Sequence, residues 1–166
     1  SGGSKVSSIS RSSSQGSLIP TSNPLDLAIS GNGFFQIANS GGGTSFTRGG
    51  SFKTNGNGQL TTSNGEPLNP EIQIPGNATN ISVSKTGGVS AQIDGQSQNL
   101  GQIQLSSFGN SAGLTAEGNS LFGETAASGA PVTGNPGVGE FGEVLSGFLE
   151  ESNVDIASEV VGQIAD

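Results

Sequence analysis

The sequence of 166 residues contains no cysteine, histidine, methionine, tryptophan or tyrosine. Without histidine it can form neither a Ser-His-Asp triad nor a metal site that uses imidazole. Without cysteine it has no thiol nucleophile and no disulfide, so the sequence would tolerate an oxidising compartment but does not identify one. These absences remove most of the side chains on which enzymes rely.

Positive charge is also scarce. Five Lys and Arg stand against 13 Asp and Glu, which gives a formal net charge of −8. A basic surface large enough for nucleic acid, or a polybasic membrane anchor, is therefore excluded. No apolar run approaches the roughly 20 residues that cross a bilayer, and no signal-peptide pattern opens the sequence. We expect neither nucleic-acid binding nor membrane insertion.

The remaining candidates for chemistry are weak. Ser82 to Lys85 spell S-x-x-K, but the S-D-N partner that this motif requires is missing. Pairs of carboxylates occur, yet nothing in the sequence holds a pair across a cleft as hydrolysis of a glycoside would need. We interpret them as solvated surface. The sequence therefore predicts no catalytic residue, no cofactor and no metal, and a protein that is not an enzyme.

The residues that are abundant point to β-structure. There are 29 glycines, and short apolar stretches alternate with Gly, Asn and Ser, which is typical of short strands joined by tight turns. Leu25, Leu27 and Ile29 alternate with smaller or polar residues, which predicts a strand with one buried face. The turn sequence "SGNG" and then "FFQI" follow, so we predict a β-hairpin over residues 25–37.

Further hairpins are predicted along the chain. Gly49 and Gly50 form a two-residue loop between the strands "TSFTR" and "SFKT", with Phe46 and Phe52 on one face. Turns at "NGNG", "KTGG" and "DGQ" separate later strands. Between residues 110 and 139 regularity fades, and "AASGAPVTGNPGVGE" has the composition of a loop.

The last residues change period. Ile156, Val160 and Ile164 are spaced by four, which is helical, and Ser152 with Asp155 fits a capping box. We therefore predict a mainly β protein: a single irregular antiparallel β-domain of short hairpins with an extended N-terminal segment and a short C-terminal helix. The predicted organisation is an extended or flexible segment over 1–22, a β-rich body over 23–150 and the start of a helix over 151–166.

Four stretches in order resemble the axial rod and hook proteins of the bacterial flagellum. They are "QGSLIPTSNPLDLAISGNGFFQI", "FTRGGSFKTNGNGQLTTSNGEPL", "GQIQLSSFGNSAGLTAEGNSLF" and "GFLEESNVDIASEVVGQI". The resemblance covers nearly the whole chain from Gln15 onward. The positions that carry it, and that we expect to serve the fold or assembly, are Gln15, Gly16, Leu25, Asp26, Ala28, Ile29, Gly31, Gly33, Phe34, Phe35, Thr47, Arg48, Phe52, Ser152, Asn153, Val154 and Asp155.

The resemblance implies a structural subunit of the flagellar basal body. The middle segment is most similar to the distal rod members, which transmit motor torque to the hook; the proximal rod and hook members are the alternatives. The implied partners are other copies of the chain in a helical axial assembly, neighbouring rod and hook proteins, and the surrounding P- and L-ring bushing. The implied location is the rod across the periplasm and outer membrane, reached by export without a cleaved signal peptide.

Two departures from the family pattern bear on assembly. The family begins with an N-terminal helix and an N-L-A-N motif, and it ends with a longer C-terminal helix than this sequence contains. Because the terminal helices of the family form the inner tube, we expect this sequence to be a core fragment that does not polymerise alone. The resemblance also places the two adjacent phenylalanines at the root of the body. Since neighbours on a strand point to opposite faces, we expect one of Phe34 and Phe35 in the core and the other available to a neighbouring subunit or to the terminal helices.

A β-rich surface adhesin or a phage-tail-like binding module remains the alternative from another class, because the Gly, Ser, Asn and Thr content would suit it equally. The helix start at "SNVD" favours the flagellar interpretation, since a binding module has little use for an amphipathic helix at its exit.

Overall fold

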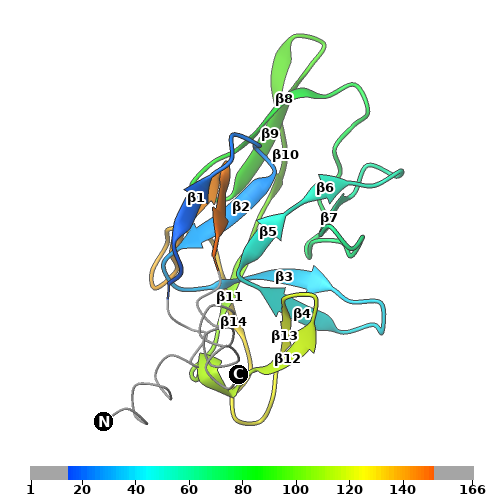
Figure 1. The fold of residues 1–166 in the computed structure, drawn as a ribbon. Helices are drawn as coiled ribbons and strands as arrows, with labels where there is room; N and C mark the ends of the chain where they lie inside the picture. The colour runs from blue at the N-terminus through cyan, green and yellow to red at the C-terminus, as the bar shows by residue number, and fades with distance from the viewer. Residues whose placement is uncertain (1–14, 152–166) are drawn as a thin grey trace, which may run out of the picture.

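The computed structural model describes residues 15–151, and that part of the chain consists of sixteen short β-strands and one turn of 3₁₀-helix, η1 (Ser111–Gly113). The prediction of a mainly β, antiparallel domain is therefore confirmed. Figure 1 shows an elongated body in which several small sheets follow one another. None of the residues that the structure describes belongs to a helix long and apolar enough to cross a membrane.

Two sheets form the central part of the body. The larger has six strands in the order β12 (Thr115–Gly118), β13 (Leu121–Gly123), β4 (Thr44–Thr47), β3 (Phe34–Ala38), β11 (Leu105–Ser107) and β14 (Val132–Gly134). The other has three strands in the order β15 (Glu143–Ser146), β2 (Asp26–Ser30) and β5 (Gly49–Ser51).

Three smaller units complete the fold. A three-stranded meander at one end of the body contains β10 (Gln96–Gln102), β9 (Gly88–Ile93) and β8 (Thr79–Val83) (Figure 1). A two-stranded hairpin joins β6 (Lys53–Thr54) to β7 (Leu60–Thr61). The third unit is a ribbon that pairs β1 (Leu18–Pro20) with β16 (Phe148–Glu150).

The hydrophobic core lies where these units meet. It includes Leu27 and Ile29 of β2, Phe35 and Ile37 of β3, and Leu105 of β11, all of which are fully buried. Residues from the meander and from the β6–β7 region join the same cluster, including Val89, Ile103, Leu60 and Ile72. This cluster therefore connects the two central sheets with the meander and the β6–β7 region.

The predicted hairpin over residues 25–37 is wrong. β2 pairs with β15 and β5, whereas β3 pairs with β4 and β11, so "SGNG" carries the chain from one sheet into another. The expectation of one buried face on β2 is also wrong, because Asp26, Leu27, Ala28 and Ile29 are all buried. β2 is covered on both faces, which alternation alone did not indicate.

The predicted loop at Gly49 and Gly50 is wrong as well. Both glycines lie in β5, opposite Ala28 and Leu27 of β2. Phe46 and Phe52 do not share a face: Phe46 contacts Phe108, with ring centroids 4.9 Å apart, while Phe52 contacts Phe35 on another side of the core. The chain reaches β5 after leaving the six-stranded sheet, so the glycine pair continues a strand instead of reversing it.

Other turns are where the sequence placed them. "NGNG" closes the β6–β7 hairpin, "KTGG" connects β8 with β9, and Asp94 and Gly95 connect β9 with β10. In contrast, the region from 110 to 139, predicted as irregular, contains β12, β13 and β14. These strands have three or four residues each, too few for a period to emerge.

The two predicted end segments have different outcomes. β1 lies within the segment 1–22 that was predicted as extended or flexible, and from Leu18 it is a strand paired with β16. The helix predicted from residue 151 onward falls almost entirely on residues 152–166, which are outside the described part of the chain.

Candidate functional site

The two ends of the described chain meet at one place. In the β1–β16 ribbon, Leu18 lies opposite Glu150 and Pro20 lies opposite Phe148. The ribbon is extended at its terminal end, where the N–H of Glu151 donates to the carbonyl of Ser17 at 2.8 Å. At its inner end the N–H of Thr21 donates to the carbonyl of Gly147, also at 2.8 Å. The segments entering and leaving the body therefore run side by side.

Arg48 occupies the centre of this meeting point. Its Nη1 donates to the carbonyls of Gly31 at 2.8 Å and Gly33 at 2.6 Å, and its Nη2 donates to the carbonyl of Ile29 at 3.1 Å. Its Nε forms an ion pair with Glu150 Oε1 at 3.2 Å, and the two side chains are only 17% and 11% exposed. A single guanidinium thus joins the turn between β2 and β3 to the last strand of the body.

Gln15 closes the arrangement from the N-terminal side. Its Oε1 accepts hydrogen bonds from the N–H of Gly31 at 2.9 Å and from Arg48 Nη2 at 3.3 Å. Its Nε2 donates to Glu150 Oε2 at 2.5 Å, and the N–H of Gly16 donates to the same oxygen at 2.9 Å. We call the group Gln15, Gly16, Gly31, Gly33, Arg48 and Glu150 the terminal junction.

The residue types of the junction follow from its geometry. Arginine is the side chain that presents several N–H donors in a planar fork, and it stays charged, so it can satisfy three carbonyls and a carboxylate together. Gly16 has no alternative, because a Cβ there would overlap the carbonyl oxygen of Glu151. Gly31 has a φ of 124°, and a Cβ there would lie 2.9 Å from the Cα of Gly142. The guanidinium also lies 5.9 Å from the centroid of the Phe34 ring, within the range of a cation–π contact.

The polar groups of this arrangement bind to one another. The Arg48 guanidinium bonds to three backbone carbonyls and to the Glu150 carboxylate, and Gln15 and Gly16 bond to the same carboxylate. Among residues 15–151 no group of three or more His, Cys, Asp or Glu side chains could hold a metal ion. The junction holds Gln15 and Gly16, at the start of the described chain, and Glu150, near its end, against the turn between β2 and β3.

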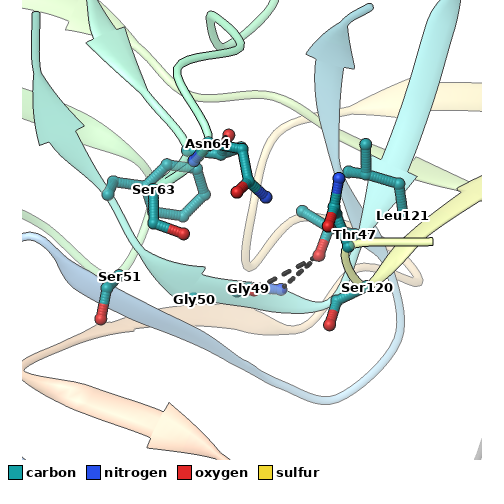
Figure 2. A pocket seen from close by; sticks show the side chains of 11 residues that line it. Thr47, Gly49, Gly50, Ser51, Ser63, Asn64, Ser120 and Leu121 are labelled. Atoms are coloured by element: carbon teal, nitrogen blue, oxygen red, sulfur yellow. Dashed lines mark hydrogen bonds between the residues drawn. The ribbon is translucent and has the colours of Figure 1, made fainter.

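A shallow hollow of about 130 Å³ lies nearby, between β5 and two loops. Figure 2 shows Gly49 and Gly50 beside it, Ser63 and Asn64 on one side, and Ser120 and Leu121 on the other. The dashed lines mark the contacts of the Thr47 hydroxyl with the N–H and carbonyl of Gly49. Its lining contains no charged side chain, so it has no group that would select a charged ligand.

The structure brings together five of the positions that the sequence singled out: Gln15, Gly16, Gly31, Gly33 and Arg48. Leu25, Asp26, Ala28 and Ile29 lie in or beside β2 and serve its packing, although Asp26 Oδ1 is buried with no hydrogen-bond partner among the described residues. Thr47 supports the start of β5, and Phe52 is core. The candidates Ser152, Asn153, Val154 and Asp155 lie outside the described part of the chain.

One residue of the junction and one of its partners were missed from sequence. Glu150 belongs to the matched stretch "GFLEES", yet its carboxylate was interpreted as solvated surface because nothing in the sequence held a carboxylate pair across a cleft. The carbonyl of Ile29, which accepts a hydrogen bond from Arg48, carries no sequence signal at all. Arg48 and Glu150 are 102 residues apart in the chain, so no local pattern connects them.

The expectation that one of the two adjacent phenylalanines is available to a partner is wrong. Phe35 is completely buried and packs edge-on against Phe52, with centroids 5.5 Å apart. Phe34 is 7% exposed and packs against Phe108 and Phe122 at 5.8 and 6.1 Å. They do point to opposite faces of β3, but each face is covered by this same chain.

Comparisons with known proteins place these features in a family context. The family model described as the flagellar hook protein FlgE/F/G D1 domain matches residues 28–91. The flagellar basal-body rod protein FlgG of Caulobacter vibrioides is 47% identical over 165 residues, which cover 98% of this chain and 63% of that protein. FlgG of Borreliella burgdorferi is 42% identical over 166 residues, again 98% and 63%.

A hook protein matches over a shorter range. The flagellar hook protein FlgE of Escherichia coli is 38% identical over 91 residues, which cover 54% of this chain and 23% of that protein. The chain spans about three-fifths of the length of the rod proteins that it matches.

Proposed function

We propose that this chain, which belongs to the family of flagellar rod and hook proteins, forms the outer body of a structural subunit of the distal rod. The observation that carries the proposal is the extent of the similarity. The match to basal-body rod proteins runs along nearly the whole chain, whereas the match to the hook protein covers about half of it. A rod subunit is therefore favoured over a hook subunit.

The geometry of the terminal junction supports a role in load transmission. A rod that transmits motor torque must transfer force from one subunit to the next. The segments within each subunit must therefore not move relative to one another under that force. The junction ties Gln15 and Glu150, near the two ends of the described chain, to β2 and to the turn between β2 and β3 through one largely buried guanidinium. The core cluster connects β2 and β3, which Arg48 contacts or borders, with the meander and the β6–β7 region. The rod protein family is structural and not enzymatic, in keeping with a site whose groups bind only chain segments.

The proposal includes partners and a location. The subunit assembles with copies of itself in a helical axial array, meets neighbouring rod and hook proteins at the two ends of that array, and turns inside the P- and L-ring bushing. It lies in the basal body where the rod crosses the periplasm and outer membrane, after export without a cleaved signal peptide. The acidic, polar outer surface suits a shaft that rotates inside a bushing without adhering to it.

Labelling of isolated basal bodies tests the proposal. A short epitope inserted between Asp94 and Gly95, in the exposed turn between β9 and β10, leaves the core and the junction unchanged. In the bacterium that encodes the chain, we expect the tagged protein to restore motility to a deletion strain. Antibody-gold should then mark the rod in electron micrographs of basal bodies.

The outcomes separate the possible roles. Label along the hook would overturn the assignment to the rod. A deletion strain that still swims and builds complete flagella would overturn the flagellar role altogether. The same insertion at the Asn55–Gly58 turn of the β6–β7 hairpin serves as a control for the position of the tag.

A further inference from the structure

The β1–β16 ribbon has a mechanical weakness that its topology creates. The described chain begins at Gln15, shortly before β1, and ends at Glu151, directly after β16, and Leu18 and Glu150 form the outermost register pair of the ribbon. A force that pulls residue 15 away from residue 151 therefore acts on this end of the ribbon first. It would open the ribbon one pair at a time toward Pro20 and Phe148. A two-stranded ribbon with three residue pairs has little strength against such opening.

The terminal junction lies just beyond this weak pair. Gln15 and Gly16 come immediately before β1, and both donate hydrogen bonds to the Glu150 carboxylate at the end of β16. Arg48 donates to the same carboxylate and to the side-chain oxygen Oε1 of Gln15, and it also donates to the backbone carbonyls of Ile29, Gly31 and Gly33. The two strands cannot begin to separate until these bonds break.

We infer that Arg48 is a clasp that keeps the β1–β16 ribbon from opening at its terminal end when residues 15 and 151 are pulled apart. Arg48 stands outside the ribbon, on the link between β4 and β5, and through Glu150 and Gln15 it anchors the terminal end of the ribbon to the central sheets. Charge-assisted hydrogen bonds are roughly twice as strong as neutral ones. Because both ionised side chains are largely buried, salt screens the pair much less than a surface pair.

The inner end of the ribbon has separate support. The N–H of Gly147 donates to the carbonyl of Asp26 and the hydroxyl of Ser146 donates to the carbonyl of Pro24, at 2.8 and 2.7 Å. Loss of the clasp should therefore free the terminal end while the inner end stays closed. A residue that stabilised only the fold as a whole would affect both ends equally, and this difference separates the two roles.

Native-state hydrogen exchange of the full 166-residue chain tests the inference. In Arg48→Met, we expect the amide of Glu151, which bonds to Ser17, to exchange at least tenfold faster than in the unaltered chain. The amide of Thr21 at the inner end, and that of Ile103, which bonds to Gly87 far from the ribbon, should change less than threefold. Lys53→Met is the matched control, because it removes the same charge from an exposed position on β6; it should leave all three amides unchanged.

Two results would overturn the inference: equal acceleration of the three amides, or no acceleration of Glu151. If Arg48→Met does not fold, Gln15→Ala decides, because Gln15 is exposed and its loss leaves the core intact. We then expect at least threefold faster exchange at Glu151 with Thr21 unchanged, and an unchanged Glu151 would refute the clasp. The inference rests on the proposed function in one respect only, namely that rotation of the rod supplies the pulling force. If labelling places the protein outside the rod but the Glu151 amide still exchanges faster in Arg48→Met, the proposed function is refuted and the role of Arg48 stands.

Discussion

Phe34 and Phe35 show how much a single residue contributes to this small core. The chain has only eight aromatic residues, all phenylalanine, and these two adjacent ones fill opposite sides of β3. Each meets at least one further phenylalanine edge-on, an arrangement that adds about 0.5–1.5 kcal/mol per pair beyond the area it buries. The two side chains therefore tie β3 to structure on both of its faces.

We expect Phe34→Ala and Phe35→Ala to lower the free energy of unfolding by similar amounts, about 3–5 kcal/mol each, because both remove a buried ring. Urea denaturation followed by circular dichroism measures the losses. Val138→Ala, at a side chain that is 59% exposed, should change the free energy by less than about 0.5 kcal/mol. A loss below about 1 kcal/mol for either phenylalanine would show that its ring is not held by this chain.

Gly49 and Gly50 allow a sharper comparison, because both have positive φ, of 142° and 153°. A Cβ at Gly49 would overlap the carbonyl oxygen of Leu27, whereas a Cβ at Gly50 would have no atom within 4 Å. We expect Gly49→Ala to destabilise the fold by about 1–3 kcal/mol more than Gly50→Ala, since it adds overpacking to the same backbone strain. Denaturant unfolding of both variants provides the test. Equal losses would mean that backbone conformation alone requires glycine in β5.

Among the elements, the meander β8–β9–β10 combines a packed root with a polar tip. Near the root, Val83, Val89 and Ile103 join the main core. At the tip, the first four residues of β10, Gln96 to Asn99, are all exposed. A hairpin end without apolar contacts has little to hold it closed apart from its backbone hydrogen bonds.

We therefore expect the tip of this meander to open locally before the central sheets unfold. In native-state hydrogen exchange, the amides of Gln92 and Gln98 should show a smaller free energy of opening than those of Phe35 and Ile37 in β3. They should also show little dependence on denaturant, as local openings do. Equal protection of the tip and of β3 would mean that the meander opens only with the whole domain.

For the molecule as a whole, its charge and surface decide whether the body alone associates. The formal net charge is −8. Among the described residues, the large hydrophobic side chains that are exposed are Ile19, Val132 and Val138, which are 43%, 57% and 59% exposed. Few apolar groups remain to bury between copies, and like charge opposes their approach.

We expect the 166-residue chain to sediment as a monomer, or at most a weak oligomer, in dilute solution. A version extended at both ends to the length of the matched rod proteins should polymerise, because paired terminal helices would bury each other's apolar stripes. Analytical ultracentrifugation and electron microscopy compare the two. Long ordered tubes from the 166-residue chain would show that the body carries the assembly contacts, and the helix-driven account of assembly would have to be abandoned.

Local sequence signals determined the class of this fold and most of its turns. Alternating apolar residues, and turn residues such as those of "NGNG" and Asp94-Gly95, determine structure through contacts between residues close together in the chain. A short stretch of sequence is therefore enough to recognise them. The family resemblance likewise depends on short ordered motifs, and it singled out Arg48, Gln15 and the glycines that the structure brings together.

The partners of the strands were decided only in three dimensions. Whether "SGNG" closes a hairpin or carries the chain into another sheet depends on β15, more than 100 residues later, which occupies the place beside β2. The burial of both rings at Phe34 and Phe35 depends on Phe52, Phe108 and Phe122 in the same way. The terminal junction is the clearest case, since Arg48 and Glu150 are 102 residues apart in the chain and form an ion pair in the fold. Contacts between residues that are distant in the chain are set by packing of the whole core, and no local pattern records them.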